Sequence, residues 1–121
     1  FVAPAGAFVV GVLGAACAYL AAVRLKRALG YDDSLDVFGI HGVAGMVGAV
    51  LTGALASTAV NPLSAGASVG AQVYGVLVTV LYAAVATGAL TLLIRVSGGL
   101  RVPEEHEETG LDLALHGEAV A

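Results

Sequence analysis

The chain has 121 residues, of which 59% are apolar and 12% are charged, and its formal net charge is −4. An average soluble domain carries about 25% charged residues, so this composition favours lipid rather than water as the surrounding solvent. No basic patch indicates nucleic-acid binding, and a single cysteine, Cys17, excludes an internal disulfide.

The first apolar stretch is predicted to form a membrane helix over about residues 1–23, because a bilayer core needs about 20 helical residues. Three basic residues follow it, Arg24, Lys26 and Arg27, and Gly30 is a plausible C-cap. The chain begins with Phe1 rather than Met and shows no signal peptide. We therefore expect it to be part of a longer protein.

The second predicted helix covers about residues 35–59 and follows the short acidic link at 31–36. We expect Asp33 or Ser34 to cap its N-terminus, and Asp36 to lie in its first turn beside the positive end of the helix dipole. Small residues recur every four positions along this helix, which indicates that other helices surround it.

The third predicted helix covers about residues 67–94, after the turn that starts at Asn61 and Pro62. Basic residues follow the first and third helices, and such residues gather on the cytoplasmic side of membranes. The sequence therefore predicts an all-α polytopic membrane protein. Its membrane part is residues 1–98 and its acidic cytoplasmic tail is residues 99–121.

His41 is the residue that a functional interpretation has to explain first. From Val37 to Ile94 there is no Asp, Glu, Lys or Arg, and ionisable groups in the membrane usually face a bundle interior or a cavity. Desolvation favours the uncharged imidazole, which has one donor and one acceptor and could pass a small polar solute. Val37, one turn earlier, would line the same path. The alternative is that His41 only bonds a neighbouring helix and serves packing.

No enzymatic, metal or cofactor site is predicted. His41 lies in a membrane span, whereas His106 and His116 lie in the tail, so the three histidines do not form a metal site. The glycines at 39, 42, 45 and 48 follow no strand and precede no phosphate-binding lysine, so they are interpreted as packing residues. No Ser/His/Asp or Cys/His arrangement is evident.

The segment DDSLDVFGIHGVAG at residues 32–45 resembles the tenth-helix signature of the ammonium transporter family, which includes relatives of the Rhesus proteins. Residues 99–105, 110–112 and 116–118 are similar to the cytoplasmic tail of that family. The resemblance covers essentially the whole chain. It implies a homotrimer in the plasma membrane, with eleven helices in each subunit, of which this chain would supply the last three and the tail.

The resemblance also implies roles for individual residues. Ammonium would lose a proton at the outer mouth, and ammonia would pass two stacked histidines, the second of which matches His41. Val37 matches an apolar pore-lining position, and Asp33 and Asp36 match acidic positions interpreted as structural. The first pore histidine would lie on an earlier helix, so this chain alone should not conduct.

The resemblance further implies that the tail contacts the neighbouring subunit and a PII-type nitrogen-signalling protein. The tail residues assigned to this role are Gly110, Leu111, Asp112, His116, Gly117 and Glu118. A tyrosine expected soon after the glutamate is replaced by the ending Ala119-Val120-Ala121.

Two other functions remain open from the residues alone. The chain could be a three-span interaction subunit that binds a larger membrane complex through its glycine seams and transports nothing itself. It could also be a membrane enzyme that uses His41 as a base, although no partner acid or nucleophile is visible.

Overall fold

The computed structural model describes residues 1–118, in which every named element is a helix, the helices are joined by short non-helical links, and one isolated β-bridge forms between Val2 and Ala56. Helices are expected here because lipid offers no hydrogen-bond partners to exposed backbone groups. The chain forms two compact units, residues 1–81 and the residues from Tyr82 onward. The elements are α1 (Pro4–Leu20), η1 (Ala21–Leu25), α2 (Lys26–Leu29), η2 (Phe38–Val43), α3 (Ala44–Leu55), η3 (Pro62–Gly66), α4 (Val69–Ser97), α5 (Glu104–Thr109) and η4 (Asp112–His116).

Among residues 1–118, three continuous helices are long and apolar enough to cross a membrane: Pro4–Leu29, Phe38–Leu55 and Val69–Ser97. The first runs through its basic residues instead of ending before them, because Lys and Arg are good helix formers. It ends at Gly30, whose φ of 63° lies in the left-handed region. The predicted glycine C-cap is therefore confirmed.

The second membrane-length helix, η2 with α3, is shorter at both ends than predicted. At its C-terminal end, Ala56 turns to an extended conformation and forms the antiparallel bridge with Val2. The Ser57 amide donates to the Phe1 carbonyl at 2.9 Å. The chain start therefore pairs with the residues that the pattern assigned to the last helical turn. The third helix, α4, starts and ends two to three residues later than predicted.

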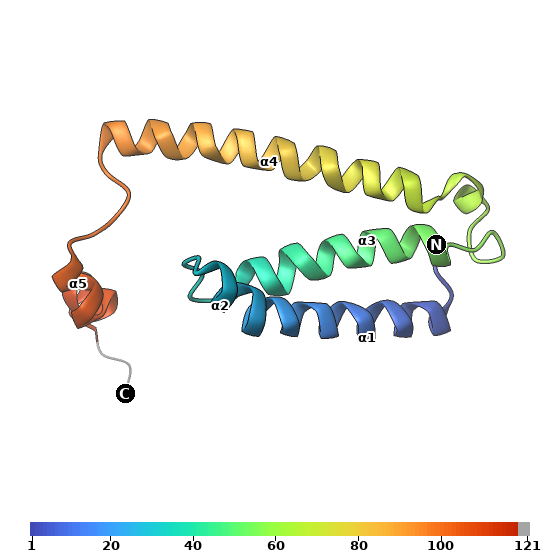
Figure 1. Cartoon of the computed structure of the whole chain (residues 1–121), viewed down its shortest axis with the longest axis horizontal. Helices are drawn as coiled ribbons and strands as arrows, with labels where there is room; N and C mark the ends of the chain where they lie inside the picture. The colour runs from blue at the N-terminus through green and yellow to red at the C-terminus, as the bar shows by residue number, and fades with distance from the viewer. Residues whose placement is uncertain (119–121) are drawn as a thin grey trace. The chain divides into compact units, whose positions relative to one another are not determined.

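Within the first unit, α1 and α3 lie side by side, and the chain start lies beside the end of α3 (Figure 1). Where η2 passes η1, Gly39 lies against the backbone of Ala22. Gly39 is buried, and a Cβ atom there would lie 2.9 Å from the Ala22 nitrogen and 3.2 Å from its Cα. Only glycine lets the two backbones touch in this way, which is the packing mode that small residues provide in membranes.

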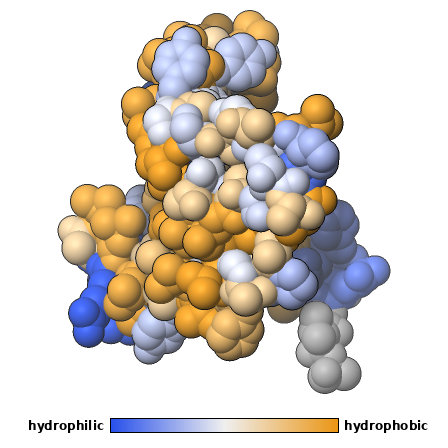
Figure 2. Space-filling view, turned by 90° about the vertical axis from the view of Figure 1, so that its right-hand side faces the viewer, coloured by the Kyte–Doolittle hydropathy of each residue, from blue (hydrophilic) through white to orange (hydrophobic). Residues whose placement is uncertain are grey.

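Most large apolar side chains of the described residues are exposed. Phe8 and Tyr82 are each 74% exposed, and α4 buries no residue. Hydrophobic residues dominate the face seen in Figure 2. Apolar surface on this scale suits contact with lipid or with further helices, so a membrane environment accounts for it.

The contact at Gly39 generates a stability prediction. We expect Gly39→Ala to lower the free energy of unfolding by about 1–3 kcal/mol, because the added methyl group would overlap the Ala22 backbone. The measurement is denaturant unfolding in detergent micelles. Gly45→Ala on the same helix is the matched control, since nothing lies within 4 Å of its added Cβ. Equal losses in the two variants would contradict a special role for the Gly39 contact.

Candidate functional site

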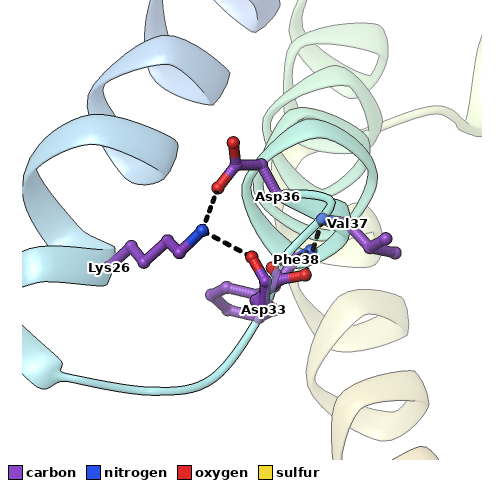
Figure 3. A network of polar contacts seen from close by, with 5 residues as sticks. All are labelled: Lys26, Asp33, Asp36, Val37 and Phe38. Carbon is purple, nitrogen blue, oxygen red and sulfur yellow. Dashed lines mark hydrogen bonds and ion pairs between the residues drawn. The ribbon is translucent and has the colours of Figure 1, made fainter. Parts of the chain in front are cut away.

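The helix that carries His41 begins at a turn capped by one carboxylate. Asp33 accepts a hydrogen bond from the Val37 amide on Oδ1 and another from the Phe38 amide on Oδ2, each at 2.9 Å (Figure 3). The first N–H groups of a helix have no partner within the helix, so this side chain satisfies two of them. Its negative charge also suits the positive end of the helix dipole.

Asp36 has a different place from the one predicted. It precedes the helix instead of lying in its first turn, and its φ of 55° lies in the left-handed region. Such a conformation costs a non-glycine residue about 1–2 kcal/mol, although aspartate tolerates it better than most. The expectation that Asp36 lies in the first turn is therefore wrong, because the chain reverses at Asp36 before the helix starts.

Lys26 connects the preceding helix to this turn. From α2, its Nζ donates to Asp36 Oδ1 at 2.7 Å and to the Asp33 carbonyl at 2.5 Å, and both contacts are visible in Figure 3. The paired side chains are 29% and 38% exposed. Ion pairs that retain this much access to solvent contribute about 0–1 kcal/mol, so the main consequence of the contact is the shape of the turn.

An aromatic pair adds a second contact between the link and the helix start. The rings of Tyr31 and Phe38 meet edge to face, with centroids 5.7 Å apart and an interplanar angle of 86°. This geometry is the one that aromatic quadrupoles favour. The Tyr31 hydroxyl is buried and has no hydrogen-bond partner among residues 1–118.

His41 is the fourth residue of η2, a π-helical segment, and so lies nearer the helix start than the six residues predicted. π-Helical turns are rare and are often found at functional sites. A second π-helical segment, η1, packs against η2 through the contact of Ala22 with Gly39. His41 is therefore carried by a segment whose backbone is constrained on one side by a neighbouring helix.

The side chains of His41 and Val37 are both exposed. In the part of the chain that the structure describes, the His41 ring has no hydrogen-bond or ion-pair partner. Its donor and acceptor nitrogens are therefore available to a solute or to a group outside residues 1–118. The Val37 side chain points away from Lys26 (Figure 3).

The six tail residues assigned from the resemblance lie around one short helix, η4. Gly110 and Gly117 flank it with φ values of 94° and 67°, and the Glu118 amide donates to the Asp112 carbonyl at 3.1 Å. Leu111 and His116 complete the set. The structure thus brings these residues into one local turn, whereas Ala119, Val120 and Ala121 lie outside the described residues.

Arg101 and Glu107 form a bidentate ion pair in the tail, with donor–acceptor distances of 3.0 and 2.6 Å. The hydrogen bond from Arg101 holds the pKa of the Glu107 carboxyl below its usual value. The sequence alone did not predict this pair, because five acidic residues lie within a few positions of one another in the tail and only the folded chain shows which of them Arg101 meets.

Within residues 1–118, no group of three or more His, Cys, Asp or Glu side chains is arranged to hold a metal ion. The site around His41 therefore consists of one imidazole, one apolar neighbour and a capped, ion-paired helix start.

The family model described as Ammonium Transporter Family matches residues 1–121. The chain belongs to the ammonium transporter family. Family membership and the three membrane-length helices identify it as a membrane protein. The resemblance seen in residues 32–45 is thereby confirmed.

Among the similar family members are an "Ammonium transporter" of Aquifex aeolicus, 45% identical, and one of Bacillus subtilis, 35% identical. A "Putative ammonium transporter" of Methanothermobacter thermautotrophicus is 43% identical. Each comparison covers 98% of this chain but only 29%, 31% and 31%, respectively, of the relative. The chain thus spans about three tenths of the length of these relatives. No solved structure shows a significant match.

From the sequence alone, Lys26 is predicted only to mark the membrane orientation, so its contacts with the link are a finding of the structure. The sequence does contain opposite charges on Lys26 and Asp36, ten positions apart across a short polar link, and this spacing is the signal for their ion pair. The spacing allows many other pairings, so only the folded turn identifies the one that forms.

The tail ion pair generates a pH prediction. Because the folded pKa of Glu107 is depressed, the pair stabilises the tail fully above the ordinary pKa of glutamate. That stabilisation is lost as the pH falls through the depressed value. We expect Arg101→Gln to raise the Glu107 pKa, as measured by carbon NMR of its labelled carboxyl. Arg95→Gln is the control variant, and an unchanged Glu107 titration in Arg101→Gln would contradict the pairing.

Proposed function

We propose that the chain contributes a pore histidine, His41, to a channel that conducts ammonium-derived ammonia across the plasma membrane. The observation that carries the proposal is an exposed histidine on a membrane-length helix in a chain of the ammonium transporter family. No Asp, Glu, Lys or Arg occurs between Val37 and Ile94. The names of the relatives, which are ammonium transporters, support the same substrate.

The proposed chemistry uses hydrogen bonding rather than fixed charge. A neutral imidazole offers one N–H donor and one acceptor nitrogen, which complement the lone pair and the N–H groups of ammonia. Val37 would line the path beside His41 and provide an apolar wall. The cationic ammonium ion would find no opposite charge along such a wall, so ammonia would be the species that passes.

The complete pore would require further helices. The chain spans 29% of the length of the Aquifex relative. We propose, as the family resemblance implies, that the native protein is a homotrimer of eleven-helix subunits, with the first pore histidine on a helix outside this chain. The basic residues after the first and third helices support a cytoplasmic tail.

A second candidate function is a three-span interaction subunit without transport of its own. The exposed apolar surface of α1 and α4 favours it, because helices of another protein could cover that surface. The two functions make opposite predictions for His41, since an interaction subunit would not depend on its imidazole.

We expect His41→Ala and His41→Glu in the full-length protein to change methylammonium uptake on the order of tenfold, or about 1.4 kcal/mol in barrier height. The alanine removes both hydrogen-bonding groups, and the glutamate introduces a carboxylate that attracts cations. The measurement is uptake into proteoliposomes, with the oligomeric state of each variant determined in parallel.

Ile40→Ala is the matched control, because Ile40 is the exposed neighbour of His41 at the same depth in the helix. We expect this variant to transport at the wild-type rate. Wild-type uptake and selectivity in both His41 variants, with oligomers intact, would overturn the pore role and leave the interaction subunit as the better account.

We also propose that the tail turn from Gly110 to Glu118 binds a PII-type signalling protein on the cytoplasmic side. The support is the similarity of this segment to the family tail and its folding into one compact turn. Gly117 ends η4 in the left-handed conformation and accepts no Cβ without strain.

We expect Gly117→Val to weaken binding of the PII-type protein from the same organism at least about tenfold, because the strained residue would open the turn. Surface plasmon resonance on the full-length protein in nanodiscs measures this change. Gly98→Ala is the control, since its Cβ would meet open space. If the two variants bind equally well, the tail turn is not the docking segment.

A further inference from the structure

Lys26 makes two contacts that neither the membrane orientation nor the proposed pore chemistry explains. Its ammonium group reaches from α2 across the link and holds two different points of it, the Asp36 carboxylate and the Asp33 carbonyl. Arg27, the next residue, is exposed and has no ion pair or hydrogen bond through its side chain within residues 1–118. The two adjacent cations therefore have different surroundings, and a general basic patch does not account for the position of Lys26.

A short chain of hydrogen bonds leads from Lys26 to the backbone that precedes His41. The Asp33 residue that Lys26 holds by its carbonyl uses its carboxylate to cap the Val37 and Phe38 amides. The carbonyl of Asp36, whose carboxylate Lys26 holds, accepts from the Ile40 amide at 2.9 Å. Both branches therefore end on the backbone that directly precedes His41.

The conformation that Lys26 holds is one that the chain does not favour by itself. Asp36 is the one non-glycine residue among residues 1–118 with positive φ, and it is followed directly by the helix start and the π-helical segment η2. A π-helical turn contains more residues than an α-helical turn, so a return to α-helical geometry would rotate the residues that follow. The direction of the His41 side chain thus depends on where the helix starts and on how it winds.

The same neighbouring helix also constrains η2 by packing. The backbone at Gly39 lies against Ala22, four residues before Lys26 on the same continuous helix. One helix therefore holds the His41 segment at two levels, by van der Waals contact at Gly39 and by the ion pair at Asp36.

We propose that Lys26 is a positioning residue for His41: by holding the left-handed turn at Asp36, it sets the rotation of the π-helical segment and so the direction of the imidazole. The expected effect of Lys26 on transport rests on the proposed pore function. Its expected effect on the orientation of the His41 ring does not. Neutralising Lys26 releases both link contacts and allows the turn to relax.

The experiment uses the full-length protein in lipid bilayers and measures His41 directly. Ring-nitrogen NMR signals of isotope-labelled histidine are assigned to His41 through a His41→Gln variant. We compare wild type with Lys26→Met, which keeps the length of the side chain and removes its charge, and with Asp36→Asn, which keeps the shape and removes the ion pair. Methylammonium uptake is measured on the same samples.

We expect Lys26→Met and Asp36→Asn to shift or broaden the His41 ring signals and to lower uptake on the order of tenfold, because misplacement by about 1 Å can reduce a rate strongly. Lys26→Arg should retain the wild-type signals and uptake, since guanidinium can donate to both oxygens. Arg27→Met is the matched control and should change neither. If Lys26→Met does not accumulate in membranes, the His41 ring signals of Asp36→Asn and wild type are compared instead to test the proposal.

Wild-type His41 signals in Lys26→Met, or in Asp36→Asn where only that variant accumulates, would overturn the proposal. Equal shifts in Arg27→Met would also overturn it. Failure of the pore function has a different signature: His41→Ala would transport at the wild-type rate, while the ring signals would still respond to Lys26→Met.

Discussion

The start of the His41 helix depends on one physical requirement, that backbone N–H groups at a helix terminus find acceptors. Asp33 satisfies two of these groups with its carboxylate, and its carbonyl in turn accepts from Lys26. Asp36 completes the turn with an ion pair and a left-handed backbone. A cap, a cation and a strained residue together decide where the helix begins, and therefore which of its residues share a face.

Small residues then decide how closely that helix approaches its neighbour. The backbone contact of Gly39 with Ala22 leaves no room for a side chain at position 39, so η1 and η2 pack backbone to backbone there. Such packing stabilises through van der Waals contact, because lipid removes the hydrophobic driving force between helices. It also keeps His41 on the side of η2 away from this contact, where its ring is exposed.

Different kinds of interaction shape the membrane part and the tail. In the membrane part, the polar interactions that shape the site are concentrated at the ends of helices, near Lys26, Asp33 and Asp36. In the tail, glycines with positive φ form a compact turn, and the hydrogen bond from Arg101 lowers the pKa of the exposed Glu107 carboxyl. A pore function for the first part and a docking function for the second are therefore compatible within one chain of the ammonium transporter family.

By itself, the sequence determined the features that depend on composition and on local backbone preference. The apolar stretches predicted three membrane helices, Gly30 predicted the end of the first, and the absence of Asp, Glu, Lys and Arg from Val37 to Ile94 singled out His41. Tertiary structure alone decided that α3 ends at Leu55, that Asp36 lies before the helix, and that Lys26 is its partner. The reason is physical: each of these features is set by a contact between residues on different segments of the chain. Val2 pairs with Ala56 and Lys26 with Asp36, and local periodicity carries no record of either pairing.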